Sequence, residues 1–280
     1  MEILLEPFRY DFMLRSFAAA VMVGIVCSVV GTYVVVRSMA FLGDALAHAV
    51  LPGIAIAYIF GGNLTLGALI AAIVVALGIS LLSNQAEIKE DTAIGILFTA
   101  SMALGIAIIS TIRTYAVDLT HILFGNILGV SSENLWFILI SGTGVLLTIV
   151  VFYRYFLVVT FDPIMGKTMR WNVQLIRSGL LVLIAVTITI SINTVGSGLV
   201  AAMLITPAAT ALMFTRRLSQ TMMLSALLGA LSGFFGLYAS YFLNISSGAS
   251  IVLVATLFFL IGYIVNRIRP LRNPDLSNSN

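Results

Sequence analysis

Runs of apolar residues, each about as long as a bilayer crossing requires, follow one another along most of this 280-residue chain. A helix needs roughly 20 apolar residues to span the hydrocarbon core of a membrane. Only 9% of the residues are charged and 60% are hydrophobic, against about 25% charged residues in a typical soluble domain. The runs are apolar on every side, which favours helices over the alternating pattern of barrel strands. We therefore predict an all-α, polytopic transmembrane helical bundle.

Eight runs are predicted to cross the membrane, and a ninth is ambiguous. The eight are residues 17–36, 64–83, 92–111, 135–153, 179–193, 199–214, 222–242 and 251–265. Residues 45–60 are shorter and are interrupted by Pro52 and Gly53, so they form either a full crossing or a discontinuous helix. Residues 1–270 are thus expected to form one transmembrane domain of eight or nine helices, and residues 271–280 a polar C-terminal tail.

The basic residues set the expected orientation, because Lys and Arg collect in cytoplasmic loops. Three basic groups fall on one side when the last four crossings alternate: Arg154, Lys167, Arg170 and Arg177; Arg216 and Arg217; Arg267, Arg269 and Arg272. The turns 193–198 and 244–248 then lie outside.

The net charge of +3 is mild and implies no nucleic-acid partner. The single cysteine, Cys27, excludes an internal disulfide and is expected to be a small buried residue.

Asp44 is the acid that stands out, because it lies within an apolar segment while the others lie in loops, near helix ends or in tails. His48 follows four residues later, and the other histidine, His121, lies in a loop. An ionisable residue at membrane depth costs roughly 3 kcal/mol and normally faces a cavity or a partner. The i, i+4 spacing places both side chains on one helix face, where a carboxylate oxygen and an imidazole nitrogen suit Mn²⁺, Zn²⁺ or Fe²⁺.

Two other interpretations of this pair stay open at the level of sequence. Asp44 could cap the N-terminus of a helix that begins at Ala45, and His48 could be a hydrogen-bonded interior histidine. One Asp and one His are too few for a tight metal site, but two symmetry-related copies would supply four ligands.

The basic segment 161–177 is the longest expected cytoplasmic loop. Its residues Ile164, Met165, Met169 and Val173 recur at helical spacing after Pro163, which predicts a short amphipathic helix over 163–173. Such a helix could lie in a groove of a partner protein or on the lipid surface. A phosphate-binding loop is excluded here, because Phe161 stands where its first glycine is required.

Glycine and proline positions complete the pattern. The spacings Gly125–Gly129 and Gly229–Gly233 favour close helix packing, within one subunit rather than between subunits. Pro52 and Pro207 are expected to interrupt apolar helices that line a cavity or only kink. The chain contains no HExxH and no GxSxG sequence, so an enzyme is not expected.

Residues 43–53, GDALAHAVLPG, closely resemble the signature of the metal-ion permease family of binding-protein-dependent ABC importers. Residues 198–210, GLVAAMLITPAAT, also resemble that family, and the hydrophobic layout is similar from end to end. The resemblance implies a permease in the bacterial inner membrane that works as a homodimer. A cytoplasmic subunit would bind ATP and Mg²⁺, and an extracytoplasmic protein would deliver the metal.

The same resemblance implies roles for particular residues. Asp44 and His48 would ligate the transported ion, which is manganese by the wording of the first motif, with zinc or iron as other possibilities. No cofactor is expected in this chain. The segment 161–177 would be the coupling helix that docks on the ATPase, through residues that include Asp162, Pro163, Met165, Gly166 and Met169.

The sequence leaves two rival functions to be distinguished. An ion-coupled secondary metal transporter acting without an ATPase would need more intramembrane charges than this pair offers. A non-transporting membrane scaffold would use Asp44 and His48 only structurally.

Overall fold

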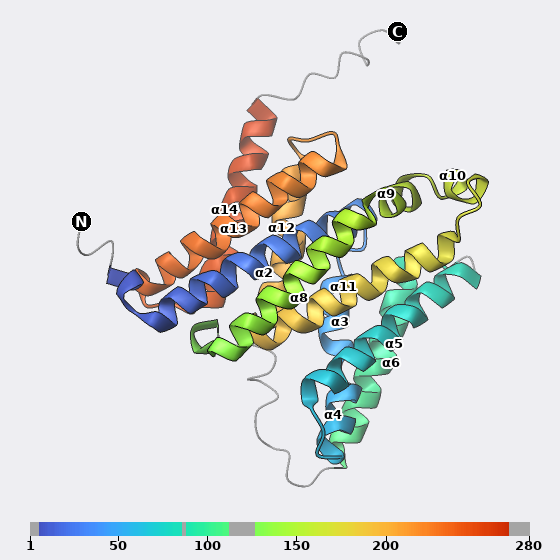
Figure 1. Ribbon diagram of the computed structural model, residues 1–280, viewed down its shortest axis with the longest axis horizontal. Coiled ribbons are helices and arrows are strands. Elements are labelled where there is room, and N and C mark those ends of the chain that lie inside the picture. The colour runs from blue at the N-terminus through green and yellow to red at the C-terminus, as the bar shows by residue number, and fades with distance from the viewer. Residues whose placement is uncertain (1–5, 86–87, 112–126, 269–280) are drawn as a thin grey trace.

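The computed structural model describes residues 6–85, 88–111 and 127–268, and within these ranges every regular element is helical (Figure 1). The helices of the first half are η1 (Glu6–Arg9), α2 (Asp11–Val36), α3 (Leu42–Ala49), α4 (Leu51–Ile59), α5 (Leu64–Gln85) and α6 (Glu90–Ser110). The second half contains η2 (Ile127–Gly129), α8 (Ser132–Val151), α9 (Tyr153–Phe161), α10 (Pro163–Thr168), α11 (Val173–Val195), α12 (Ser197–Leu212), α13 (Leu218–Leu243) and α14 (Ser247–Ile268). The all-α polytopic bundle is confirmed. Residues 271–280 lie outside the described residues.

Eight of the described spans are long and apolar enough to cross a membrane, and α12 is a shorter apolar helix. The segment Leu42–Ile59 counts as one of the eight, although it is broken at Val50 into α3 and α4. The sequence left a full crossing and a discontinuous helix open for this segment, and the structure shows a segment that is long enough to cross and is divided at Val50. Pro52 explains the break, because it has no N–H to donate to the carbonyl of His48.

Side-chain contacts between helices mark the two ends of the bundle. Arg15 at the start of α2 donates to Ser132 at the start of α8 over 3.1 Å. At the opposite end, Arg37 and Arg177 both contact Glu90. Most described basic residues lie at the second end: Arg37, Lys89, Arg154, Lys167, Arg170, Arg177, Arg216, Arg217 and Arg267. This end is cytoplasmic by the distribution of basic residues, and α2 begins on the outer side.

Helix α2 is the central packing element, and small residues let its neighbours approach. A Cβ at Gly24 would lie 2.5 Å from the carbonyl oxygen of Gly229 in α13, and one at Gly233 would lie 2.8 Å from the carbonyl oxygen of Ala20. The Gly229–Gly233 spacing thus joins helices within one subunit, as predicted. Gly125 lies outside the described residues. Cys27 is fully buried, with its Sγ 3.4 Å from Ser191 Oγ.

Pro207 does not interrupt its helix, contrary to the expectation from sequence. Helix α12 continues through it from Ser197 to Leu212. A proline removes the N–H that would bond to the carbonyl four residues earlier, here that of Met203. Ser28 of α2 donates its hydroxyl to this carbonyl over 3.3 Å. The freed acceptor is therefore satisfied between helices, and no break is needed.

The turn between α11 and α12 lies at the outer ends of these two helices, as expected, and it is buried within the protein. Thr194, Val195, Gly196 and Ser197 are all buried. Ser191 of α11 lies beside Cys27, which is near the middle of α2. Helix α11 therefore ends only about 6 Å further along its axis, well below the outer end of α2. Gly196 adopts a φ of 85°, which favours glycine at this tight turn.

Candidate metal site

Asp44 and His48 lie side by side on the open face of α3. Asp44 Oδ1 is 3.7 Å from His48 Nε2. The side chain of Asp44 is 48% exposed and that of His48 is 26% exposed. The sequence prediction that both share one helix face is borne out by this distance, and their donor atoms converge closely enough to contact one ion.

The rest of α3 is buried, which fixes how this pair is presented. Leu42, Gly43, Ala45, Leu46 and Ala49 are all buried. Gly43 packs on α12, since a Cβ at its position would lie 3.2 Å from Leu204 Cδ1 and 3.5 Å from Ala201 Cα. The apolar side of α3 is thereby anchored in the core, and its two polar side chains are directed to the open side.

Asp44 is not the N-cap of a helix that begins at Ala45. Helix α3 begins at Leu42 and its N-cap is Phe41. Asp44 thus lies within the first turn, where its charge is favourable near the helix N-terminus. The capping interpretation of this acid is wrong.

One aromatic ring from α6, that of Phe98, lies beside the pair. Phe98 lies with its ring centroid 6.2 Å from that of His48 and 5.7 Å from that of Phe41. Phe98 is eight residues into α6, about 12 Å from the cytoplasmic end of that helix. The pair therefore lies at membrane depth, on a face that is otherwise apolar.

The broken helix that carries the pair is held by close backbone contacts. A Cβ at Gly53 of α4 would lie 2.1 Å from the carbonyl oxygen of Gly67 in α5. One at Gly105 of α6 would lie 2.7 Å from Leu51 Cβ. These glycines let α4 pack against both neighbours just beyond the break at Val50, which fixes the direction in which α3 leaves it.

One protomer offers too few donors to enclose an ion. Among the described residues, no group of three or more His, Cys, Asp or Glu side chains is arranged to hold a metal. His121 lies outside the described residues. What the arrangement can do is present one carboxylate oxygen and one imidazole nitrogen to a shared site.

The predicted coupling segment forms a shorter helix than expected. Helix α10 covers only Pro163–Thr168, and Arg170 has a φ of 58°, which ends it. Asp162 caps it by accepting the Met165 N–H over 2.9 Å. Gly166 is buried, while Ile164, Met165 and Met169 are exposed. The segment therefore presents apolar side chains outward at the cytoplasmic end, near the bend that α9 and α10 make (Figure 1).

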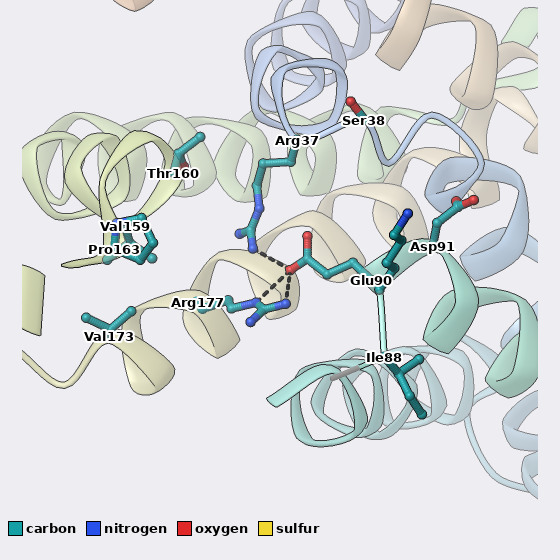
Figure 2. A pocket seen from close by; sticks show the side chains of 11 residues that line it. Arg37, Ser38, Ile88, Glu90, Asp91, Val159, Thr160, Pro163, Val173 and Arg177 are labelled. Atoms are coloured by element: carbon teal, nitrogen blue, oxygen red, sulfur yellow. Dashed lines mark hydrogen bonds and ion pairs between the residues drawn. The ribbon is translucent and has the colours of Figure 1, made fainter. Parts of the chain in front are cut away.

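Sequence reasoning missed the partly buried ion-pair cluster of Arg37, Glu90 and Arg177. Figure 2 shows both guanidinium groups directed at the Glu90 carboxylate. Each of the three residues lies at a helix end in the sequence, where charges are common. Their partners are 53 and 87 residues away, so no local pattern could have revealed them.

Comparison with known proteins decides the family. Residues 9–266 match the family described as ABC 3 transport family. The chain belongs to the ABC 3 transport family. Like other members it is a multi-pass membrane protein, and the eight apolar spans agree with that. The expected resemblance to ABC importer permeases is confirmed.

Curated relatives in the ABC 3 transport family carry transport names. The manganese transport system membrane protein MntC of Halalkalibacterium halodurans is 46% identical over 91% of this chain and 87% of its own length. The manganese import system permease protein ScaB of Streptococcus parasanguinis is 39% identical over 92% of this chain and 91% of its own length.

Solved structures share the fold. PsaBC from Streptococcus pneumoniae, in complex with Fab, contains a chain with a TM-score of 0.81 and 36% identity. The match covers 94% of this chain and 95% of that one. A metal-chelate type ABC transporter in an inward-facing conformation matches with a TM-score of 0.68 at 16% identity. It covers 90% of this chain and 86% of the other, and shows the fold alone.

Proposed function

We propose that this chain is the membrane-spanning permease subunit of an ATP-driven importer for a divalent transition metal, with Mn²⁺ as its substrate. The observation that carries the proposal is the half-exposed Asp44 beside His48 at membrane depth. A carboxylate on a lipid-facing surface would be expensive. The face that carries it therefore belongs against water, an ion or a second copy of the chain.

A second copy resolves both the exposure and the shortage of ligands. Two Asp44–His48 pairs across a two-fold axis would provide two carboxylates and two imidazoles. Mixed oxygen and nitrogen ligation suits Mn²⁺, and also Zn²⁺ or Fe²⁺. The relatives named as manganese transport proteins support Mn²⁺. Partly open ligation is also what transport requires, because an ion held too tightly would not leave.

The other proposed partners are inferred from the exposed residues at the cytoplasmic end and from the family to which the chain belongs. Helix α10, with the flanking residues Asp162 and Met169, would dock in a groove of a cytoplasmic subunit that binds and hydrolyses ATP. Its exposed Ile164, Met165 and Met169 suit an apolar groove. An extracytoplasmic metal-binding protein would deliver the ion to the outer side, and the bilayer surrounds the dimer.

The test is reconstitution in liposomes with and without the ATP-binding subunit. The complex should accumulate Mn²⁺ only with ATP, while Asp44→Ala and His48→Ala complexes should assemble but show no uptake. A cysteine at Ile164 or Met165 should cross-link to the ATPase. Uptake by the permease alone would establish the secondary transporter instead, and full uptake by either alanine variant would remove the pair from the mechanism.

A further inference from the structure

The partly buried cluster of Arg37, Glu90 and Arg177 joins three segments of the chain: one leads to α3, one is the start of α6 and one leads to α10. Glu90 Oε1 accepts a hydrogen bond from Arg37 Nη2 and another from Arg177 Nε at 2.6 Å. Arg177 also donates through Nη2 to Ser83 Oγ of α5 over 2.9 Å. The three side chains are 10%, 14% and 22% exposed, for Arg37, Glu90 and Arg177 in that order. One carboxylate therefore holds two guanidinium groups that would otherwise repel each other.

From Arg37, a tight connection leads to the metal pair. Ser38 donates its N–H to Val35 O and Met39 donates to Val34 O, over 3.0 and 2.9 Å. Ser38 adopts a φ of 58°, unusual for a residue other than glycine. The chain therefore turns sharply and enters α3 through a short, hydrogen-bonded connection. Asp44 follows only seven residues after Arg37.

From Glu90, helix α6 leads to the other side of the same pair. Glu90 is the first residue of α6, and Phe98 follows it two turns later on the same helix. Phe98 packs against His48 and Phe41. A tilt of α6 at its cytoplasmic end would therefore move the ring that lies beside the imidazole.

From Arg177, the start of α11 leads to α10. Asn172 caps α11 by accepting the Leu175 N–H over 3.0 Å. Trp171 donates its N–H to Gly166 O of α10 over 3.1 Å, and a Cβ at Gly166 would lie 3.0 Å from Val173 Cγ2. Helices α10 and α11 are thus tied together, so a displacement of α10 carries Arg177 with it.

A cavity beside the cluster leaves room for such a movement. It has a volume of about 490 Å³ and is lined by Arg37, Glu90 and Arg177 together with Pro163 of α10 and Val173 of α11. Figure 2 shows Pro163 and Val173 across from the ion pairs. Arg37 Nη1 is buried without a hydrogen-bond partner. Burial lowers the pKa of Arg37, and the Glu90 carboxylate opposes that shift.

We propose that Glu90 is a positioning residue that transmits the movement of α10 to the Asp44–His48 pair, so that ATP hydrolysis stays coupled to metal passage. The inference rests on the proposed function, because it assumes that α10 meets an ATPase and that the pair binds the ion. It adds a residue that touches neither the metal nor the ATPase.

The experiment measures Mn²⁺ imported per ATP hydrolysed by the complete complex in liposomes. Glu90→Gln keeps the side-chain shape and removes the charge, and we expect the ratio to fall at least tenfold. Mn²⁺ affinity at the Asp44–His48 pair should stay within twofold of wild type. Asp91→Asn is the matched control, since Asp91 lines the same cavity and is exposed, and its ratio should be unchanged.

The outcomes separate coupling from mere structure. A structural role would lower uptake and ATP hydrolysis in proportion, and an unchanged ratio for Glu90→Gln overturns the proposal. If that variant does not assemble, Arg177→Lys retains the charge but loses the paired geometry, and it should lower the ratio about threefold. An unchanged ratio there also overturns the proposal. Absence of ATP-dependent uptake by the wild-type complex overturns the proposed function and this inference together.

Discussion

The Asp44–His48 pair and the Arg37–Glu90–Arg177 cluster handle charge inside a membrane protein in opposite ways. The cluster is closed: its carboxylate is largely buried and is bonded to two guanidinium groups. The pair is open: its carboxylate is half-exposed, and its nearest basic group is an imidazole at 3.7 Å. A closed cluster joins helices, because its one carboxylate is already paired with guanidinium groups from two other segments. An open pair of donors on an apolar face is free to take a ligand, which is what the proposed transport role requires.

Metal binding should show the largest difference between the two sites. We expect one Mn²⁺ per two chains, with affinity reduced at least 100-fold by Asp44→Asn or by His48→Gln, because each change replaces two of the four ligands in the dimer with neutral amides that bind the ion more weakly. Titration of the purified complex with analysis of bound metal measures both quantities. One tightly bound ion per chain would show instead that a single protomer completes the site.

For the free energy of unfolding, we expect a substitution in the closed cluster to have a larger effect than one in the open pair. Glu90→Gln removes a charged acceptor shared by two partly buried guanidinium groups, so we expect it to lower the free energy of unfolding by about 2 kcal/mol. That loss corresponds to roughly 5 °C in Tm for a chain of this size. Asp44→Asn should leave the Tm of the metal-free protein unchanged or slightly higher, because it removes an uncompensated charge. Thermal unfolding in detergent compares the two, and a larger loss for Asp44→Asn would invalidate the distinction between closed and open sites.

The sequence was sufficient for the open pair and insufficient for the closed cluster, for a physical reason. Asp44 and His48 are four residues apart, so helix geometry alone places them together. Glu90 meets residues that are far away in the chain, and only the packing of α2, α6 and α11 brings them together. Long apolar runs likewise predicted the helical fold, since lipid permits few alternatives, but they left open whether there are eight or nine crossings.

The two prolines show the same limit. Pro52 lies in the first turn of α4, just after a break, whereas Pro207 lies inside an unbroken helix, although both lie in apolar runs. The difference lies in Ser28, whose hydroxyl reaches the carbonyl that Pro207 leaves free. That neighbour comes from a helix 175 residues earlier, which no local pattern could indicate. The predicted α10 was also too long, because the left-handed Arg170 ends it.

A substitution in α4, just beyond the break at Val50, should have an intermediate effect on stability and on Mn²⁺ uptake. Gly53→Ala would place a Cβ 2.1 Å from the carbonyl oxygen of Gly67, so we expect a loss of about 1–3 kcal/mol from overpacking. The displaced α4 should also disturb α3 and lower Mn²⁺ uptake several-fold. Gly144→Ala in α8 is the control, because nothing lies within 4 Å of its Cβ position. It should be neutral or stabilise by about 0.5 kcal/mol, and equal losses at both positions would contradict this account.

The cap of α10 should give the smallest effect. Asp162→Ala removes the acceptor for the Met165 N–H and should destabilise this short helix by about 1 kcal/mol. We expect a two- to fivefold weaker affinity for the ATP-binding subunit, measured by titration of the permease with that subunit. Asp162→Asn keeps an acceptor oxygen and should bind almost normally. If both variants bind equally well, the cap plays no part in docking.

The buried turn between α11 and α12 has a consequence for how the protein is made. A helix of 16 residues that starts below the outer ends of its neighbours is poorly matched to lipid as a separate span. Its Met203 carbonyl finds its donor on α2, which is synthesised long before. During biogenesis α12 must therefore leave the insertion machinery onto a surface that α2 has already prepared, and changes at Ser28 should delay maturation even where they leave the finished transporter intact.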